Sequence, residues 1–201
     1  MKIKFGITII ICAFIFQACK NNVEEISEVK ESVLLPDMSI YNLSGEWLTQ
    51  DSSTIKLESY RGDIVVVALM YASCKAACPK IISDMINIEK NIKPEELQKV
   101  KFILISIDPQ NDTPLVLKKT ATEYQMDLTR WTLITGTESN VRDIAAVLSF
   151  KYKKSTPTDF VHSNIISVLD MDGALAYQQS GIESDNTQTL NMIHTLIAQK
   201  N

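Results

Sequence analysis

Two cysteines four positions apart, Cys74 and Cys78, are the residues of this sequence best placed to do chemistry. A thiolate is a nucleophile and a ligand for soft metals, so such a pair can be a structural disulfide, a redox couple or two metal ligands. The pair follows an apolar run over Asp63–Tyr71, and a helical pattern begins after Pro79. Strand ends are where α/β sheets place ligand sites, and helix N-termini stabilise thiolates. This position favours a reactive or metal-binding pair.

Two cysteines are too few for a closed structural zinc site, which takes four nitrogen or sulfur ligands. Metal binding would therefore require at least a third ligand from elsewhere in the chain. The sequence has two histidines. His162 lies in a predicted loop before the strand that starts at Asn164. His194 lies on the last predicted helix, where a surface position is the simplest interpretation. The residues alone leave the disulfide, the redox pair and the metal site open.

The N-terminal residues 1–18 predict a lipoprotein signal peptide. Two lysines precede an apolar stretch from Phe5 to Phe16, which is too short to cross a bilayer as a helix. The run Phe16-Gln17-Ala18-Cys19 resembles the lipobox of bacterial lipoproteins, in which cleavage precedes a cysteine that receives the lipid. Phe16 replaces the usual Leu, and an ordinary secretory signal is the alternative.

We therefore predict lipidation at Cys19, a flexible membrane tether over residues 19–32 and a folded domain over residues 33–201. This organisation predicts an exported protein that is lipid-anchored to a bacterial membrane, with its domain facing the periplasm. Cleavage before Cys19 also leaves Cys74 and Cys78 as the remaining thiols.

Composition fits one ordinary globular domain, since 45% of the 201 residues are hydrophobic and 22% are charged. The formal charge is −4, and cleavage lowers Lys+Arg from 20 to 18 against 24 Asp+Glu, which gives −6. We expect no nucleic-acid partner, because phosphate binding requires clustered cations and the sequence has no basic stripe.

Hydrophobic periodicity predicts an α/β fold, a mixed sheet with flanking helices and an N-terminal β-hairpin extension. The predicted elements are a hairpin within Tyr41–Leu57, strands at Asp63–Tyr71, Lys101–Ile107 and Trp131–Ile134, helices at Lys80–Lys90, Thr113–Met126, Glu138–Phe150 and Thr187–Gln199, and a hairpin of Asn164–Leu169 with Ala174–Gln178.

Several of these segments together resemble the Sco/SenC family. The resemblance covers Leu34 to the C-terminus and is carried by Cys74-x-x-x-Cys78-Pro79, by Ile105–Pro114, by Trp131–Gly136 and by His162-Ser163 before a strand. It implies a thioredoxin-like fold and a role in assembling the copper centre of cytochrome c oxidase. It also implies that Cys74, Cys78 and His162 bind a copper ion.

The sequence departs from the family between the two cysteines. Family members commonly carry Pro and Asp there, whereas this chain has Lys75-Ala76-Ala77. Loss of the acid disfavours a bound divalent ion, and a nearby cation should depress the thiol pKa. Of two nearby acids, we interpret Asp108 as a turn former rather than a partner of a metal ligand, and Asp112 as a helix cap.

Two function classes follow from the residues and the resemblance. The first is a monomeric, membrane-tethered copper metallochaperone that passes copper to the copper-bearing subunit of cytochrome c oxidase. The second is a thiol-disulfide oxidoreductase in which Cys74 and Cys78 attack and resolve a substrate disulfide. Neither the copper oxidation state nor the attacking cysteine follows from the sequence.

Overall fold

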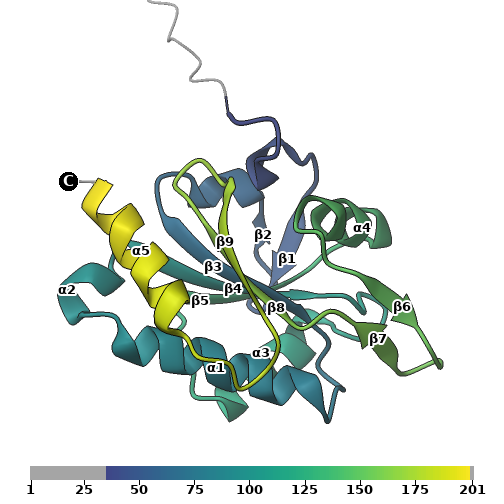
Figure 1. Ribbon diagram of the computed structural model, residues 1–201. Helices are drawn as coiled ribbons and strands as arrows, with labels where there is room; N and C mark the ends of the chain where they lie inside the picture. The colour runs from purple at the N-terminus through teal and green to yellow at the C-terminus, as the bar shows by residue number, and fades with distance from the viewer. Residues whose placement is uncertain (1–34, 200–201) are drawn as a thin grey trace, which may run out of the picture. The chain divides into compact units, whose positions relative to one another are not determined.

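The computed structural model describes residues 35–199 (Figure 1). The predicted signal peptide, the tether and Cys19 lie outside the described residues. The elements are η1 (Ile40–Asn42), β1 (Trp47–Thr49), β2 (Thr54–Ile55), η2 (Leu57–Tyr60), β3 (Ile64–Met70), α1 (Ala77–Asn91), α2 (Pro94–Leu97), β4 (Val100–Ser106), α3 (Pro114–Glu123), β5 (Trp131–Thr135), α4 (Glu138–Val147), β6 (Tyr152–Lys154), β7 (Phe160–His162), β8 (Ile165–Leu169), β9 (Leu175–Ser180) and α5 (Thr187–Gln199).

A seven-stranded mixed sheet in the order β2-β1-β5-β4-β3-β8-β9 forms the centre of the domain. The parallel strands are β3, β4 and β5, and the remaining neighbours pair antiparallel. All seven residues of β3 are buried, as is typical of a central strand in a parallel part of a sheet. The continuous apolar run of β3 therefore predicted a central strand correctly.

The crossovers β3-α1-β4 and β4-α3-β5 step the same way across the sheet, so right-handed connections place α1 and α3 on one face. Figure 1 shows α1, α3 and α5 along that face and α4 on the other. The inner side of α1 buries apolar residues spaced three or four apart, including Ile81, Met85 and Ile88. This packing fixes the N-terminus of α1 beneath the end of β3.

Both predicted hairpins are present. β1 and β2 pair antiparallel, and β1 also pairs with β5, so the N-terminal hairpin extends the main sheet. β8 and β9 are joined by a turn in which Gly173 has φ +74°, a left-handed conformation that glycine adopts without strain.

Three helix boundaries differ from the prediction by three residues, and one of them is the end of α3, at Glu123 rather than Met126. Helix α1 begins at Ala77 rather than Lys80, so Pro79 lies inside its first turn. Proline is tolerated there, because the first N–H groups of a helix have no partner within the helix. Helix α4 ends at Val147 rather than Phe150, because Ser149 adopts a left-handed conformation with φ +51°.

The sequence prediction also missed the short helix α2 and the hairpin of β6 and β7. This hairpin is a separate two-stranded sheet, in which Tyr152 pairs with His162 and Lys154 with Phe160. His162 is therefore the last residue of a strand rather than a loop residue. Among the described residues, no helix is both long and apolar enough to cross a membrane.

Candidate metal centre

The two cysteines lie where β3 gives way to α1. Cys74 is held in the connecting turn by its backbone N–H, which donates to the Tyr71 carbonyl at 3.2 Å. Cys78 lies in the first turn of α1, and its N–H donates to Cys74 Sγ at 3.4 Å. The N-cap residue of α1, Ala76, offers no side-chain hydrogen bond to the helix. The Cys74 sulfur therefore accepts from an N-terminal amide of α1 in place of a capping oxygen.

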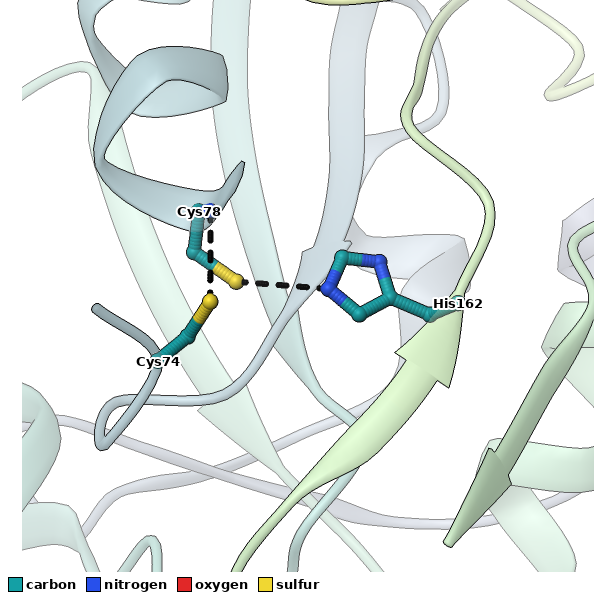
Figure 2. A group of neighbouring side chains, drawn as sticks. All are labelled: Cys74, Cys78 and His162. Atoms are coloured by element: carbon teal, nitrogen blue, oxygen red, sulfur yellow. Dashed lines mark hydrogen bonds between the residues drawn. The ribbon is translucent and has the colours of Figure 1, made fainter. Parts of the chain in front are cut away.

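His162 reaches the cysteines from the β6–β7 hairpin, with its ring directed at the sulfurs (Figure 2). Its Nε2 atom lies 3.7 Å from Cys78 Sγ, and its Nδ1 atom lies 2.8 Å from the Ser163 carbonyl oxygen. A carbonyl oxygen only accepts, so Nδ1 carries the proton when the imidazole is neutral. The lone pair of Nε2 then faces the sulfurs, as metal coordination by histidine requires.

Aromatic contacts fix the imidazole plane. The ring stacks on Phe150 at a centroid distance of 5.8 Å and an interplanar angle of 20°. Tyr71 meets it edge-on at 5.8 Å and 88°. These two contacts restrict the orientation of the ring, whose Nε2 side is directed toward Cys78.

The ligand atoms of Cys74, Cys78 and His162 all lie within 4.8 Å of one another. No carboxylate joins this group in the part of the chain that the structure describes. Two sulfurs and one imidazole nitrogen form a soft donor set that fits Cu(I), whereas hard cations require oxygen ligands. Both cysteines also line a cavity of about 140 Å³.

The two thiols differ in acidity. Burial raises the pKa of Cys74, but hydrogen bonds, chiefly from the Cys78 backbone and thiol and the Ala76 backbone, outweigh it and lower that pKa to about 6. Burial raises the pKa of Cys78, and the neighbouring Cys74 thiolate raises it further. Cys74 is therefore the thiolate at neutral pH, and Cys78 retains its proton in the absence of a metal.

Asp112 does not cap α3, and the sequence prediction for it was wrong. The cap is Thr113, whose side chain accepts from the Val116 N–H. Asp112 is 2% exposed, and its Oδ2 accepts from the Ala72 N–H at 3.0 Å and the Ser106 hydroxyl at 2.6 Å. Asp112 therefore joins the segment after β3 to the end of β4. Its partner Ala72 lies two residues before Cys74.

Asp108 forms a turn, as predicted. Its carbonyl accepts from the N–H groups of Asn111 and Asp112, at 3.0 and 2.9 Å. Its carboxylate accepts from Asn111 and lies 4.0 Å from the Lys154 ammonium, on the hairpin that carries His162. The other histidine, His194, pairs with Glu96 at 3.1 Å and is not part of the group.

Tyr71 and Asp159 are site residues that the sequence analysis missed. The Tyr71 hydroxyl donates to Asp159 Oδ1 at 3.0 Å across 88 positions of sequence. Tyr71 reads locally as the last apolar residue of a buried strand, and Asp159 as a turn residue. No local pattern indicates that the two meet.

A sequence model of the family described as SCO1/SenC matches residues 42–198. The chain belongs to this family. The SCO1 protein homolog of Bacillus subtilis (strain 168) is 30% identical over 138 residues, which cover 67% of this chain and 71% of that protein. A SCO2-like protein of Rickettsia typhi is 24% identical over 134 residues, and the match covers 64% of each chain. The chain thus spans slightly less than two thirds of the Rickettsia relative.

Solved structures of Sco proteins confirm the thioredoxin-like fold. A SCO1/SenC family lipoprotein from Bacillus anthracis superposes with a TM-score of 0.70 at 22% identity, over 78% of this chain and 95% of that one. BsSco, a Sco family cytochrome c oxidase assembly protein described with a disulfide switch, has a TM-score of 0.70 at 22% identity, over 82% of this chain and 98% of that one. Copper-bound ScoI from Bradyrhizobium japonicum has a TM-score of 0.61 at 18% identity, over 76% of this chain and 96% of that one.

Proposed function

We propose that this chain is a copper metallochaperone that holds copper through Cys74, Cys78 and His162 and delivers it to the copper-bearing subunit of cytochrome c oxidase. The observation that carries the proposal is the placement of two sulfurs and an imidazole nitrogen within 4.8 Å. The hydrogen bond from His162 Nδ1 to Ser163 supports it, because it leaves Nε2 free to coordinate.

Family membership supports copper as the cargo and the oxidase as the recipient. A related structure is described with copper bound, and another is described as a cytochrome c oxidase assembly protein. A relative of the same fold is described as a lipoprotein. Together with the lipobox-like run ending at Cys19, this supports an exported chain that is lipid-anchored to a bacterial membrane. Our proposal also includes a signal peptide over residues 1–18, a tether over 19–32 and a monomeric domain over 33–201.

Copper titration of the reduced full chain, in detergent and without oxygen, tests the proposed ligands. We expect one Cu(I) per chain, with much weaker binding in Cys74→Ser and Cys78→Ser. His162→Ala should bind Cu(I) at least tenfold more weakly, because it removes one of three ligands and leaves both thiols. His194→Ala is the matched control and should bind as the wild type does. Unchanged binding by His162→Ala would remove His162 from the proposed site.

The opposite pKa shifts of the two thiols favour a second candidate function, thiol-disulfide exchange. The Cys74 thiolate would attack one sulfur of a substrate disulfide, which breaks that bond and releases the other sulfur as a thiolate. Cys78 would then give its proton to that thiolate, attack the Cys74 sulfur and release the second substrate sulfur as a thiolate. The substrate gains two electrons, Cys74 and Cys78 become a disulfide, and an external dithiol must reduce the pair for another turnover.

His162 separates the two functions. In a strain that lacks the wild-type protein, His162→Ala should fail to restore oxidase activity if copper delivery is the function. The same variant should restore activity if exchange alone is required, because it retains both thiols. The initial rate at which the variant reduces a model disulfide checks that its thiols remain reactive.

A further inference from the structure

The hairpin that carries His162 is not hydrogen-bonded into the main sheet. β6 and β7 pair with each other, and no backbone ladder joins them to the seven-stranded sheet in the described residues. Apart from the short chain link through Ser163 and Asn164 into β8, side-chain contacts therefore set the distance between His162 and the cysteines. Ring contacts with Phe150 and Tyr71 hold its plane, but such contacts are weakly directional compared with a hydrogen bond.

A directional contact joins the cysteine turn to the tip of this hairpin. The Tyr71 hydroxyl, three residues before Cys74, donates to the Asp159 carboxylate, three residues before His162. Tyr71 directly follows the last residue of the buried strand β3 and is itself only 4% exposed. The Asp159 side is also fixed, because the Asp159 carbonyl accepts from the Ser155 N–H at 2.8 Å and closes the loop between β6 and β7.

We propose that Tyr71 is a positioning residue that, through its hydrogen bond to Asp159, holds the β6–β7 hairpin so that His162 Nε2 faces the two sulfurs. The proposal rests on the proposed function for its copper readout and has a second readout that does not require copper. Additional support comes from Phe160, between Asp159 and His162, whose ring packs 5.1 Å from that of Tyr71. Ser73 reaches the same loop through the Thr158 carbonyl, at the long distance of 3.5 Å.

The first test is Cu(I) affinity of the reduced full chain in detergent, measured in competition with a chromogenic Cu(I) chelator. Tyr71→Phe and Asp159→Ala should each bind about tenfold more weakly, or about 1.4 kcal/mol, as expected for a lost hydrogen bond to a charged acceptor. Asp159→Asn keeps an acceptor oxygen and should stay within about threefold of the wild type. Tyr152→Phe, opposite His162 in the hairpin, is the matched control and should bind normally.

Burial raises the pKa of Tyr71, and the neighbouring Cys74 raises it further, so Tyr71 could also act on Cys74 directly. Measuring Tyr71→Phe in the His162→Ala background distinguishes positioning of His162 from such a direct effect. If Tyr71 acts through His162, Tyr71→Phe should change affinity less than about twofold in that background. A tenfold loss that persists without His162 would overturn the proposal, as would near-normal affinity of both Tyr71→Phe and Asp159→Ala in the presence of His162.

Hydrogen exchange of the metal-free protein separates failure of this proposal from failure of the proposed function. Tyr71→Phe and Asp159→Ala should speed exchange of the β6–β7 ladder amides about tenfold, and Tyr152→Phe should not. If His162→Ala binds copper normally but this acceleration is seen, the positioning role stands and the copper ligand set is wrong. Unchanged exchange in Tyr71→Phe would refute the positioning role whatever copper does.

Discussion

Replacing Asp112 by alanine should destabilise the domain at the base of the candidate site. One carboxylate oxygen of Asp112 accepts from both the Ala72 N–H and the Ser106 hydroxyl. Ser106 is fully buried and Ala72 is half-buried, so water replaces the lost acceptor at best partly. An unsatisfied buried donor costs about 1–3 kcal/mol, so we expect a loss of about 2–4 kcal/mol. That is a large part of the roughly 5–15 kcal/mol that stabilises a domain.

Asp112→Asn is the matched control, since its amide oxygen can replace the carboxylate oxygen that accepts both hydrogen bonds. We expect it to lose less than about 1 kcal/mol near neutral pH. Burial raises the pKa of Asp112, with a contribution from the Asp108 charge, against hydrogen bonds from Ser106 and Ala72 that lower it. The unfolded chain therefore releases this proton first, and wild-type stability should fall relative to Asp112→Asn as pH rises above about 4.

Urea unfolding of the metal-free protein measures the wild type and both variants. The Asp112→Ala midpoint should move to lower urea with an unchanged slope, because the surface exposed on unfolding is the same. The reasoning is refuted if Asp112→Ala lies within about 0.5 kcal/mol of the wild type, since the two hydrogen bonds would then contribute almost nothing. Equal destabilisation by Asp112→Asn would show that the charge, rather than the acceptor oxygen, is required.

Two further predictions concern thiol acidity and turn geometry. The rate of alkylation by iodoacetamide should rise with a midpoint near pH 6 as Cys74 ionises, while Cys78 reacts far more slowly; a first midpoint above pH 8 would contradict the hydrogen-bonded thiolate. Gly173→Ala should cost about 2–4 kcal/mol in thermal unfolding, because its φ is +74° and the new Cβ would lie 2.7 Å from the Tyr41 ring. Gly62 has a similar φ, +93°, but a Cβ added there would meet no atom within 4 Å, so Gly62→Ala should lower the free energy of unfolding by only about 1 kcal/mol. Equal losses of stability in the two variants would rule out the clash with Tyr41.

The sequence was sufficient for the parts of the fold that local pattern determines. The apolar runs of β3 and β4, the helical spacing in α1 and the turn at Gly173 each appear in consecutive residues. The hairpin of β6 and β7 does not, because its short polar strands, including Lys153 and Lys154, resemble a loop. Its packing on the end of β3 comes from residues more than 80 positions away.

The candidate site divides in the same way. Cys74 and Cys78 follow from their spacing at a strand end, and His162 follows from the family resemblance. The role of Asp112 could not be predicted, because a helix-start pattern, Asp-Thr-Pro, accounts for the same residue. Its true partners are Ala72, two residues after β3, and Ser106, the last residue of β4, which only the folded chain brings together.

The use of the Cys74 sulfur as acceptor for the first turn of α1 ties the backbone to the state of the thiol. A proton, a metal ion or a second sulfur on Cys74 draws on the same electron density that receives the Cys78 amide. Isotope-edited spectra of that one amide should therefore report whether the sulfur is protonated, loaded or oxidised, without any added dye or reagent. The Cys78 amide at the start of α1 thus reports the chemical state of the Cys74 sulfur.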